Sequence, residues 1–293
     1  MNNHWGDLAT AKTLERGPLC VGIDPAWENI PNSFKQDNLS RCEALRNYCR
    51  FMIEHVGNLV GFIKPQSAYF EAYGSEGLKV LSEIIKLAKS RSLLVVLDAK
   101  RGDIGATSEA YANAYLNPTS GSDLEVDCMT VNPFLGPETV MPFIDVANKF
   151  GKGLIILART SNADAGWIQD IPCQNGNVST KISEFICREA SKNTGDAGVS
   201  NIGAVVGATY SEEAGNLRSL MPNSIFLMPG IGAQGGSSEA LKNGYIDAQS
   251  RTGVIVPVSR GVTCVEDPNI SEALYRETII KRIQNLNATL RLH

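Results

Sequence analysis

The run LLVVLDAK at residues 93–100 decides the fold, because it joins a short apolar stretch to a charged end. It is too short and too rich in Val and Leu for a typical helix, so it predicts a buried strand. Seven similar runs, bounded by turn residues, recur about 33 residues apart on average: PLCVGID (18–24), LVGFIKP (59–65), LEVDCMTVN (124–132), GLIILART (153–160), NIGAVVGAT (201–209), SIFLMPGIG (224–232) and GVIVPVSRG (253–261).

Amphipathic stretches between these runs predict helices, among them 41–56, 76–90, 178–192 and 271–286. Alternation of nearly continuous apolar strands with helices indicates a parallel sheet covered on both faces. Eight such units fit one (β/α)8 TIM barrel. Because no linker or composition break divides the chain, we expect residues 1–293 to form a single domain. A doubly wound open sheet is the alternative.

The composition is that of a globular protein, with 43% hydrophobic and 20% charged residues. A net charge of −4 provides no basic surface for nucleic acid or an anionic membrane. Seven cysteines form no CxxC pair or zinc-site spacing, and three scattered histidines make Ser-His or Cys-His catalysis an unfavoured reading. The N-terminus lacks a signal-peptide pattern, and no apolar run is long enough to span a bilayer. We therefore expect a cytoplasmic protein.

Four of the eight runs end in charge, at the strand ends where a parallel barrel carries its active site. The residues concerned are Asp24, Lys64, Asp98 with Lys100, and Arg260. Asp98 and Lys100 are two apart, so regular alternation along a strand places both side chains on one face. A structural ion pair is one reading of them. A catalytic cluster explains better why two lysines and two acids would share a water-poor site, since their burial is unfavourable.

The segment after this strand places Asp103 at the start of the next helix and Thr107 one turn further on the same face. Asp103 is interpreted either as part of the charged cluster or as a helix cap, since a carboxylate accepts free N–H groups there.

The glycine-rich segment 230–236 follows the seventh run, and its first six residues match GxGxxG. A dinucleotide site is disfavoured, because the motif does not open the fold and the next strand does not end in an acid. Phosphate binding by this loop together with Arg260 is favoured, since the loops after strands seven and eight form the usual phosphate site of a barrel. A purely conformational turn is the alternative. Segment 161–177 is interpreted as a surface excursion or as a lid over the barrel mouth.

The string DAKRGDIGAT at 98–107 resembles the D-x-K-x-x-D-I-x-x-T signature of orotidine 5′-monophosphate decarboxylases. Further segments resemble the longer bacterial branch of that family, in order and nearly end to end: GIDP (22–25), FIKPQSAYFE (62–71), PGIGAQGG (229–236) and SRG (259–261). The resemblance implies decarboxylation of orotidine 5′-monophosphate to uridine 5′-monophosphate without metal or cofactor, in a homodimer with composite active sites.

The resemblance also implies a role for each matching residue. Lys100 corresponds to the proton donor to C6, Asp98 to the carboxylate facing the substrate carboxylate, and Lys64 to the lysine that orders the charges and touches the ribose. The substrate-binding residues it implies are Asp24 for the ribose, Gln234, Gly235 and Arg260 for the phosphate, Ser161 for the pyrimidine, and Asp103, Ile104 and Thr107 from the neighbouring subunit.

Two rival functions remain open. A Mg²⁺-dependent sugar-phosphate decarboxylase or aldolase of the same superfamily is disfavoured, because those relatives carry a metal-binding Glu where this chain has Lys64, and a lysine opposes a divalent cation. A non-catalytic barrel that binds a phosphate ligand is disfavoured by the complete set Lys64, Asp98, Lys100 and Asp103.

Overall fold

The computed structural model describes residues 4–209, 211–231 and 238–292. Parallel strands close into a barrel in the order β1-β10-β9-β8-β5-β4-β3-β2, which confirms the (β/α)8 fold over the open sheet. The barrel strands are β1 (Leu19–Ile23), β2 (Phe62–Pro65), β3 (Leu94–Arg101), β4 (Cys128–Val131), β5 (Gly153–Arg159), β8 (Ile202–Val206), β9 (Phe226–Leu227) and β10 (Val254–Val258).

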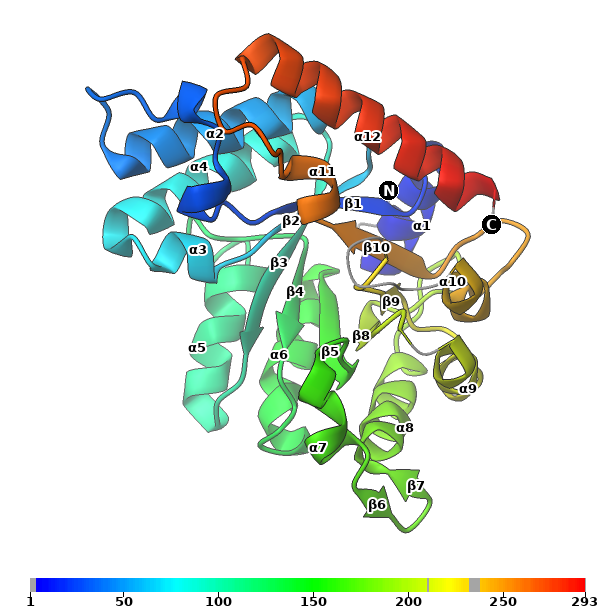
Figure 1. Cartoon of the computed structure of the whole chain (residues 1–293). Coiled ribbons are helices and arrows are strands. Elements are labelled where there is room, and N and C mark those ends of the chain that lie inside the picture. The colour runs from blue at the N-terminus through cyan, green and yellow to red at the C-terminus, as the bar shows by residue number, and fades with distance from the viewer. Residues whose placement is uncertain (1–3, 210, 232–237, 293) are drawn as a thin grey trace.

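Helices surround the strands (Figure 1). The helices between or after barrel strands are α2 (Arg41–Val56), α3 (Ala68–Glu71), α4 (Gly74–Ser90), α5 (Gly105–Leu116), α6 (Pro137–Phe150), α7 (Gly166–Gln169), α8 (Val178–Ala190), α9 (Ser211–Leu220), α10 (Ser238–Gly244), α11 (Arg260–Thr263) and α12 (Glu272–Leu292), and α1 (Trp5–Arg16) precedes β1. Short 3-10 turns occupy Trp27–Asn29, Asn32–Phe34 and Ala163–Ala165. No helix in the described ranges has the length and apolar character needed to cross a membrane.

Local signals explain where some helices begin and end. Ser40 and Glu43 form a reciprocal capping box at the start of α2, which satisfies two backbone N–H groups. Pro137 occupies the first turn of α6, where its missing N–H is harmless, and Gly151 ends that helix in the left-handed conformation at φ 67°.

The interior of the barrel is apolar at its N-terminal end. Side chains that alternate along the strands form this inner cluster, including Phe62, Val96, Cys128 and Ile155, and Trp5 of α1 packs with them. Gly153 leaves room for the Trp5 ring, because a Cβ there would lie 2.6 Å from it. Helix α1 therefore closes this end, and ligands must enter from the other.

Segment 161–177 contains more structure than a loop excursion. It holds α7 and a two-stranded antiparallel hairpin of β6 (Pro172–Cys173) and β7 (Gly176–Asn177), which projects at the foot of Figure 1. Gln169 anchors the segment to the end of β5: its Oε1 accepts from the Thr160 N–H at 3.0 Å and its Nε2 donates to Thr160 Oγ1 at 2.7 Å. Arg159 Nη1 lies 2.8 Å from Asp170 Oδ1 and adds an ion pair.

Candidate active site

Charged side chains replace apolar ones in the last layer of the barrel interior. Phe62 and Val96 belong to the inner apolar cluster, and two residues later on the same strands come Lys64 and Asp98. Because side chains alternate, these two charges continue the inward-facing rows. They therefore lie at the C-terminal end of the barrel, as the sequence predicts.

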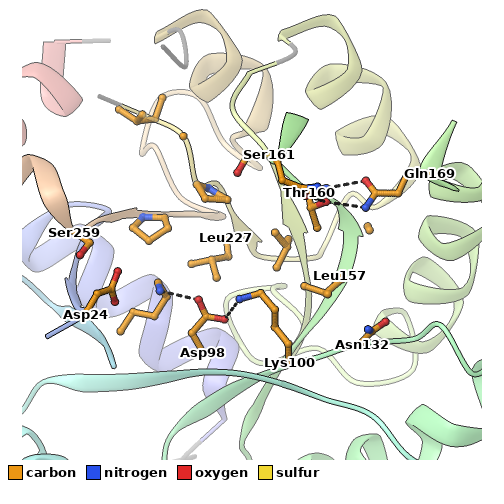
Figure 2. Close-up of a pocket in the computed structure, with 18 of the residues that line it drawn as sticks. Asp24, Asp98, Lys100, Asn132, Leu157, Thr160, Ser161, Gln169, Leu227 and Ser259 are labelled. Atoms are coloured by element: carbon orange, nitrogen blue, oxygen red, sulfur yellow. Dashed lines mark hydrogen bonds and ion pairs between the residues drawn. The ribbon is translucent and has the colours of Figure 1, made fainter. Parts of the chain in front are cut away.

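The Asp98 carboxylate lies between two ammonium groups. Lys64 Nζ is 2.8 Å from Asp98 Oδ2, and both side chains are only 10% exposed. Lys100 Nζ pairs with the other oxygen, Asp98 Oδ1, while its side chain keeps 44% of its surface exposed (Figure 2). The predicted meeting of Asp98 and Lys100 is thus confirmed, with Lys100 as the ammonium that reaches the open cavity.

The two lysines keep Asp98 ionised. Burial disfavours the charged carboxylate, but the charges of Lys64 and Lys100 and their hydrogen bonds outweigh it and lower the pKa of Asp98 to about 2. For Lys64, burial opposes the charge, and the carboxylates of Asp98 and Asp24 more than compensate, so its pKa is raised. The site therefore holds fixed charges at neutral pH.

The geometry that brings Lys100 to Asp98 is not the regular strand that the sequence suggested. Lys100 has a positive φ of 47°, and the register between β3 and β4 shifts between Leu97 and Arg101. A bulge rather than simple alternation therefore aims the lysine, since a bulge re-directs the side chains next to it.

A cavity of about 630 Å³ opens over this array. Its walls come from the ends of most barrel strands and from segment 161–177, as Figure 2 shows for ten labelled residues. Predicted site residues among its lining are Asp24, Lys64, Asp98, Lys100, Ser161 and Arg260. The volume is that of a typical small-molecule site.

Two polar atoms in the cavity wall have no hydrogen-bond partner among the described residues. They are Asp24 Oδ1 and Ser259 Oγ, both buried, and Figure 2 shows the two side chains on the same side of the cavity. Buried polar groups are normally paired, so both are suited to a ligand's hydroxyl or phosphate groups. The sequence singled out Asp24 but not Ser259, although Ser259 immediately precedes Arg260.

Arg260 is exposed at the mouth of the cavity, where it begins α11 after β10. This is the place that the phosphate-site prediction requires. Gln234 and Gly235 lie outside the described residues, and so does most of the glycine-rich segment.

Asp103, Ile104 and Thr107 do not line the cavity of their own chain. Asp103 does not cap α5: the helix begins at Gly105 after Ile104, and among the described residues Asp103 Oδ1 accepts only from the neighbouring Ile104 N–H at 2.8 Å. The helix-cap interpretation is therefore wrong, because three residues, 102–104, separate the end of β3 from the first residue of the helix. Ile104 is 63% exposed.

Sequence reasoning missed the polar residues Asn132, Thr160 and Gln169 in the cavity wall. Asn132 was visible as the polar end of the fourth apolar run, and Thr160 as the end of the fifth. Gln169 carries no local signal, because only the path of segment 161–177 brings it back to β5. Among the described residues, no three His, Cys, Asp or Glu side chains gather into a metal-binding group.

Comparisons with known proteins agree with this geometry. The sequence model of the orotidine 5′-phosphate decarboxylase / HUMPS family matches residues 17–272. The chain is 38% identical over 262 residues to an orotidine 5′-phosphate decarboxylase of Rhodopirellula baltica, which covers 86% of this chain and 85% of the relative. This chain belongs to that family.

Further relatives extend the family match to the chain ends. An orotidine 5′-phosphate decarboxylase of Deinococcus radiodurans is 35% identical over 294 residues, or 99% of each chain. The structure of Leishmania donovani OMP decarboxylase matches with a TM-score of 0.73 at 27% identity and covers 97% of this chain and 98% of that chain. The charged array of Lys64, Asp98 and Lys100 thus lies in the cavity of a member of a decarboxylase family.

Proposed function

We propose that this chain decarboxylates orotidine 5′-monophosphate to uridine 5′-monophosphate and CO2, in de novo pyrimidine biosynthesis, without a cofactor. The observation that carries the proposal is one carboxylate held between two ammonium groups below a cavity, in a member of this decarboxylase family.

The reaction needs an ammonium group because of where its charge develops. When the bond between C6 and the carboxylate breaks, its electron pair stays on C6 in an sp² orbital that the ring cannot delocalise. A fixed cation beside C6 stabilises this carbanion electrostatically. The Lys100 ammonium then gives its proton to C6 as a general acid, and the resulting neutral amine regains a proton from water.

Asp98 and Lys64 fix the lysine that does this chemistry. Asp98 binds the Lys100 ammonium and faces the position of the substrate carboxylate, where its negative charge would repel that group. Lys64 neutralises the other oxygen of Asp98 from a buried position and reaches toward the ribose. The array is pre-organised, so little rearrangement is needed when the charge develops.

Substrate binding uses the cavity wall on either side of the array. Asp24 binds a ribose hydroxyl through the oxygen that the protein leaves unpaired. Arg260 binds the phosphate together with Gln234 and Gly235, and Ser161 contacts the pyrimidine. Phosphate binding far from C6 supplies energy for closing the site around the reacting bond.

A second subunit completes each site. Asp103, Ile104 and Thr107 do not line the cavity of their own chain, so in a two-fold dimer they are free to enter the partner's. Exposed apolar side chains lie on the segments that follow the adjacent strands β2, β3 and β4, and one of them, Phe134, also lines the cavity: Tyr69, Ile104, Phe134 and Leu135. These residues support an isologous homodimer.

The whole chain acts as one domain in the cytoplasm. The net charge of −4 gives no support to a nucleic-acid partner, so the ligands are the nucleotide substrate and product.

Release of CO2 from orotidine 5′-monophosphate, measured in EDTA, tests the proposed function. We expect full turnover in chelator and much slower turnover of orotidine, which lacks the phosphate. Activity lost in EDTA and restored by Mg²⁺ on a sugar phosphate would instead support the metal-dependent rival. Tight binding of uridine 5′-monophosphate with no CO2 release would support a non-catalytic barrel.

A further inference from the structure

One residue of β4 faces the bulge that carries the lysine and the aspartate. Leu97 pairs with Met129 and Arg101 pairs with Val131, so three residues of β3, 98–100, lie opposite the single residue Thr130. Thr130 follows Cys128 of the inner apolar cluster by two residues, which places its side chain in the barrel interior. Its side chain is fully buried.

The Thr130 hydroxyl makes every hydrogen bond that a hydroxyl can make. Its Oγ1 accepts the backbone N–H of Ala99 at 3.1 Å and of Lys100 at 2.9 Å. It donates to Asp98 Oδ1 at 3.1 Å. One donor and two acceptor positions are thus filled, and all three partners belong to the bulge.

These bonds hold a conformation that the backbone would not choose alone. The φ of Lys100 is 47°, a left-handed conformation that is unfavourable for a residue with a side chain. Such a conformation is kept only where contacts with neighbouring residues stabilise it. In the bulge the two N–H groups have lost regular partners on β4, and Thr130 Oγ1 accepts both.

We propose that Thr130 is a positioning residue that fixes the direction of the Lys100 side chain and the orientation of the Asp98 carboxylate for proton transfer. The inference rests on the proposed role of Lys100 as the proton donor. Thr130 itself does not line the cavity, so it acts through the two residues that do. Without its hydroxyl, two partly buried N–H groups lose their acceptor and Asp98 loses a donor, while the ion pair of Lys64 with Asp98 has no reason to break.

Thr130→Val tests the proposal, because it keeps the shape and removes the hydroxyl. A displacement of about 1 Å at a reacting group lowers rates by about 100-fold, so we expect kcat to fall between about 30- and 100-fold. The KM and the Kd of uridine 5′-monophosphate should change less than about threefold, since Asp24 and Arg260 are untouched. Thr130→Ser restores the hydroxyl and should return kcat to within about fivefold of wild type.

The matched control is Thr252→Val, which removes another buried threonine hydroxyl at the opposite end of the barrel, where it contacts Ser250 at 3.1 Å. Its kcat should stay unchanged. If Thr130→Val does not fold, Thr130→Cys replaces it, because a thiol is a weaker donor and acceptor of similar size. We then expect kcat to fall about tenfold at unchanged product affinity.

Three results would overturn the proposal: unchanged kcat in Thr130→Val or its Cys substitute, equal loss in the Ser and Val variants, or parallel loss of kcat and product affinity. A Lys100→Ala enzyme assayed beside them separates the two ideas. If it is inactive while Thr130→Val is fully active, only the positioning role fails. If Lys100→Ala keeps its activity, the proposed role of the lysine fails first.

Discussion

The Asp98 carboxylate is shared by two lysines that have unequal access to the cavity. Lys64 is nearly buried, whereas Lys100 keeps 44% of its side chain exposed. Lys64 therefore balances the charge of Asp98 in the floor of the site, whereas Lys100 is accessible to a substrate atom in the cavity. This is why we assign proton transfer to Lys100 rather than to Lys64.

Replacing Lys100 by Ala should lower kcat by about 10²- to 10⁴-fold, which is the usual contribution of a general acid. The affinity for uridine 5′-monophosphate should largely remain, because the ammonium matters most after the bond to C6 begins to break. Isothermal titration and CO2 release measure the two quantities, with exposed Lys281→Ala on α12 as the control. A Lys100→Ala enzyme that keeps a tenth of wild-type kcat would contradict the assignment.

The lowered pKa of Asp98 predicts a pH-dependent contribution to stability. Its pKa falls from 3.8 to about 2 on folding, so the carboxylate stabilises the fold above pH 3.8, and this contribution is lost as pH falls toward 2. It amounts to about 2 kcal/mol at neutral pH, of which roughly half is gone at pH 3.

Urea unfolding of wild type and Asp98→Asn at several acidic pH values isolates this group, because the titrations of the other carboxylates cancel in the difference. The gap in unfolding free energy should narrow as pH falls from 5 to 3. A gap that stays the same down to pH 3 would show that the lysines do not lower the pKa of Asp98.

The sequence predicts those helix and strand bounds that depend on nearby residues. Helix α2 matches the expected bounds 41–56, since its capping box and amphipathic pattern are both local. The seventh strand is shorter than its apolar run: β9 spans only Phe226–Leu227, because burial extends beyond regular pairing. The hairpin of β6 and β7 was not predicted, as two-residue strands leave no periodicity to detect.

The bulge in β3 marks the limit of sequence reasoning at the site. Two-residue spacing correctly placed Asp98 beside Lys100, but the backbone reaches this arrangement through a left-handed lysine held by Thr130 on the next strand. Such a contact depends on the register between strands, which one sequence does not specify. Asp103 was read as helical for the same reason, since the exit from the bulge delays the start of α5.

Arg260, at the junction of β10 and α11, should act mainly on phosphate binding. Arg260→Ala loses charge-assisted hydrogen bonds to an anion, so we expect KM to rise about 10- to 100-fold with a smaller change in kcat. The variant should also discriminate less between the nucleotide and orotidine. Exposed Arg276→Ala on α12 serves as the control. Unchanged nucleotide affinity in Arg260→Ala would place the phosphate site elsewhere.

Segment 161–177 is fixed to the end of β5 by Gln169 and by the ion pair of Arg159 with Asp170, so its order should depend in part on the Gln169 side chain. Gln169→Ala removes two hydrogen bonds to Thr160, worth about 1 kcal/mol each, and should raise KM about three- to tenfold. Limited proteolysis should cut this segment faster than in wild type. Gln174→Ala, at an exposed position in the hairpin turn, should change neither. Equal proteolysis of the two variants would argue against the anchor.

At the scale of the whole molecule, the barrel divides its ends between stability and function. Helix α1 and Trp5 close one end with apolar packing, while the other carries the charged array and an exposed apolar surface that includes Ile104 and Phe134. Asp103 does not line the cavity of its own chain. We propose that the functional unit is a dimer in which the partner subunit's Asp103 lies beside each Lys100.

Mixing two inactive variants tests whether the sites are composite. In a heterodimer of Lys100→Ala with Asp103→Ala, one site lacks both side chains and the other has both. Random exchange at equal concentrations gives about half heterodimers, so about a quarter of wild-type CO2 release from orotidine 5′-monophosphate should return. If no activity returns in a mixture that mass spectrometry shows to have exchanged subunits, the composite site is contradicted. Asp103 would then act in the site of its own subunit or have no role in catalysis.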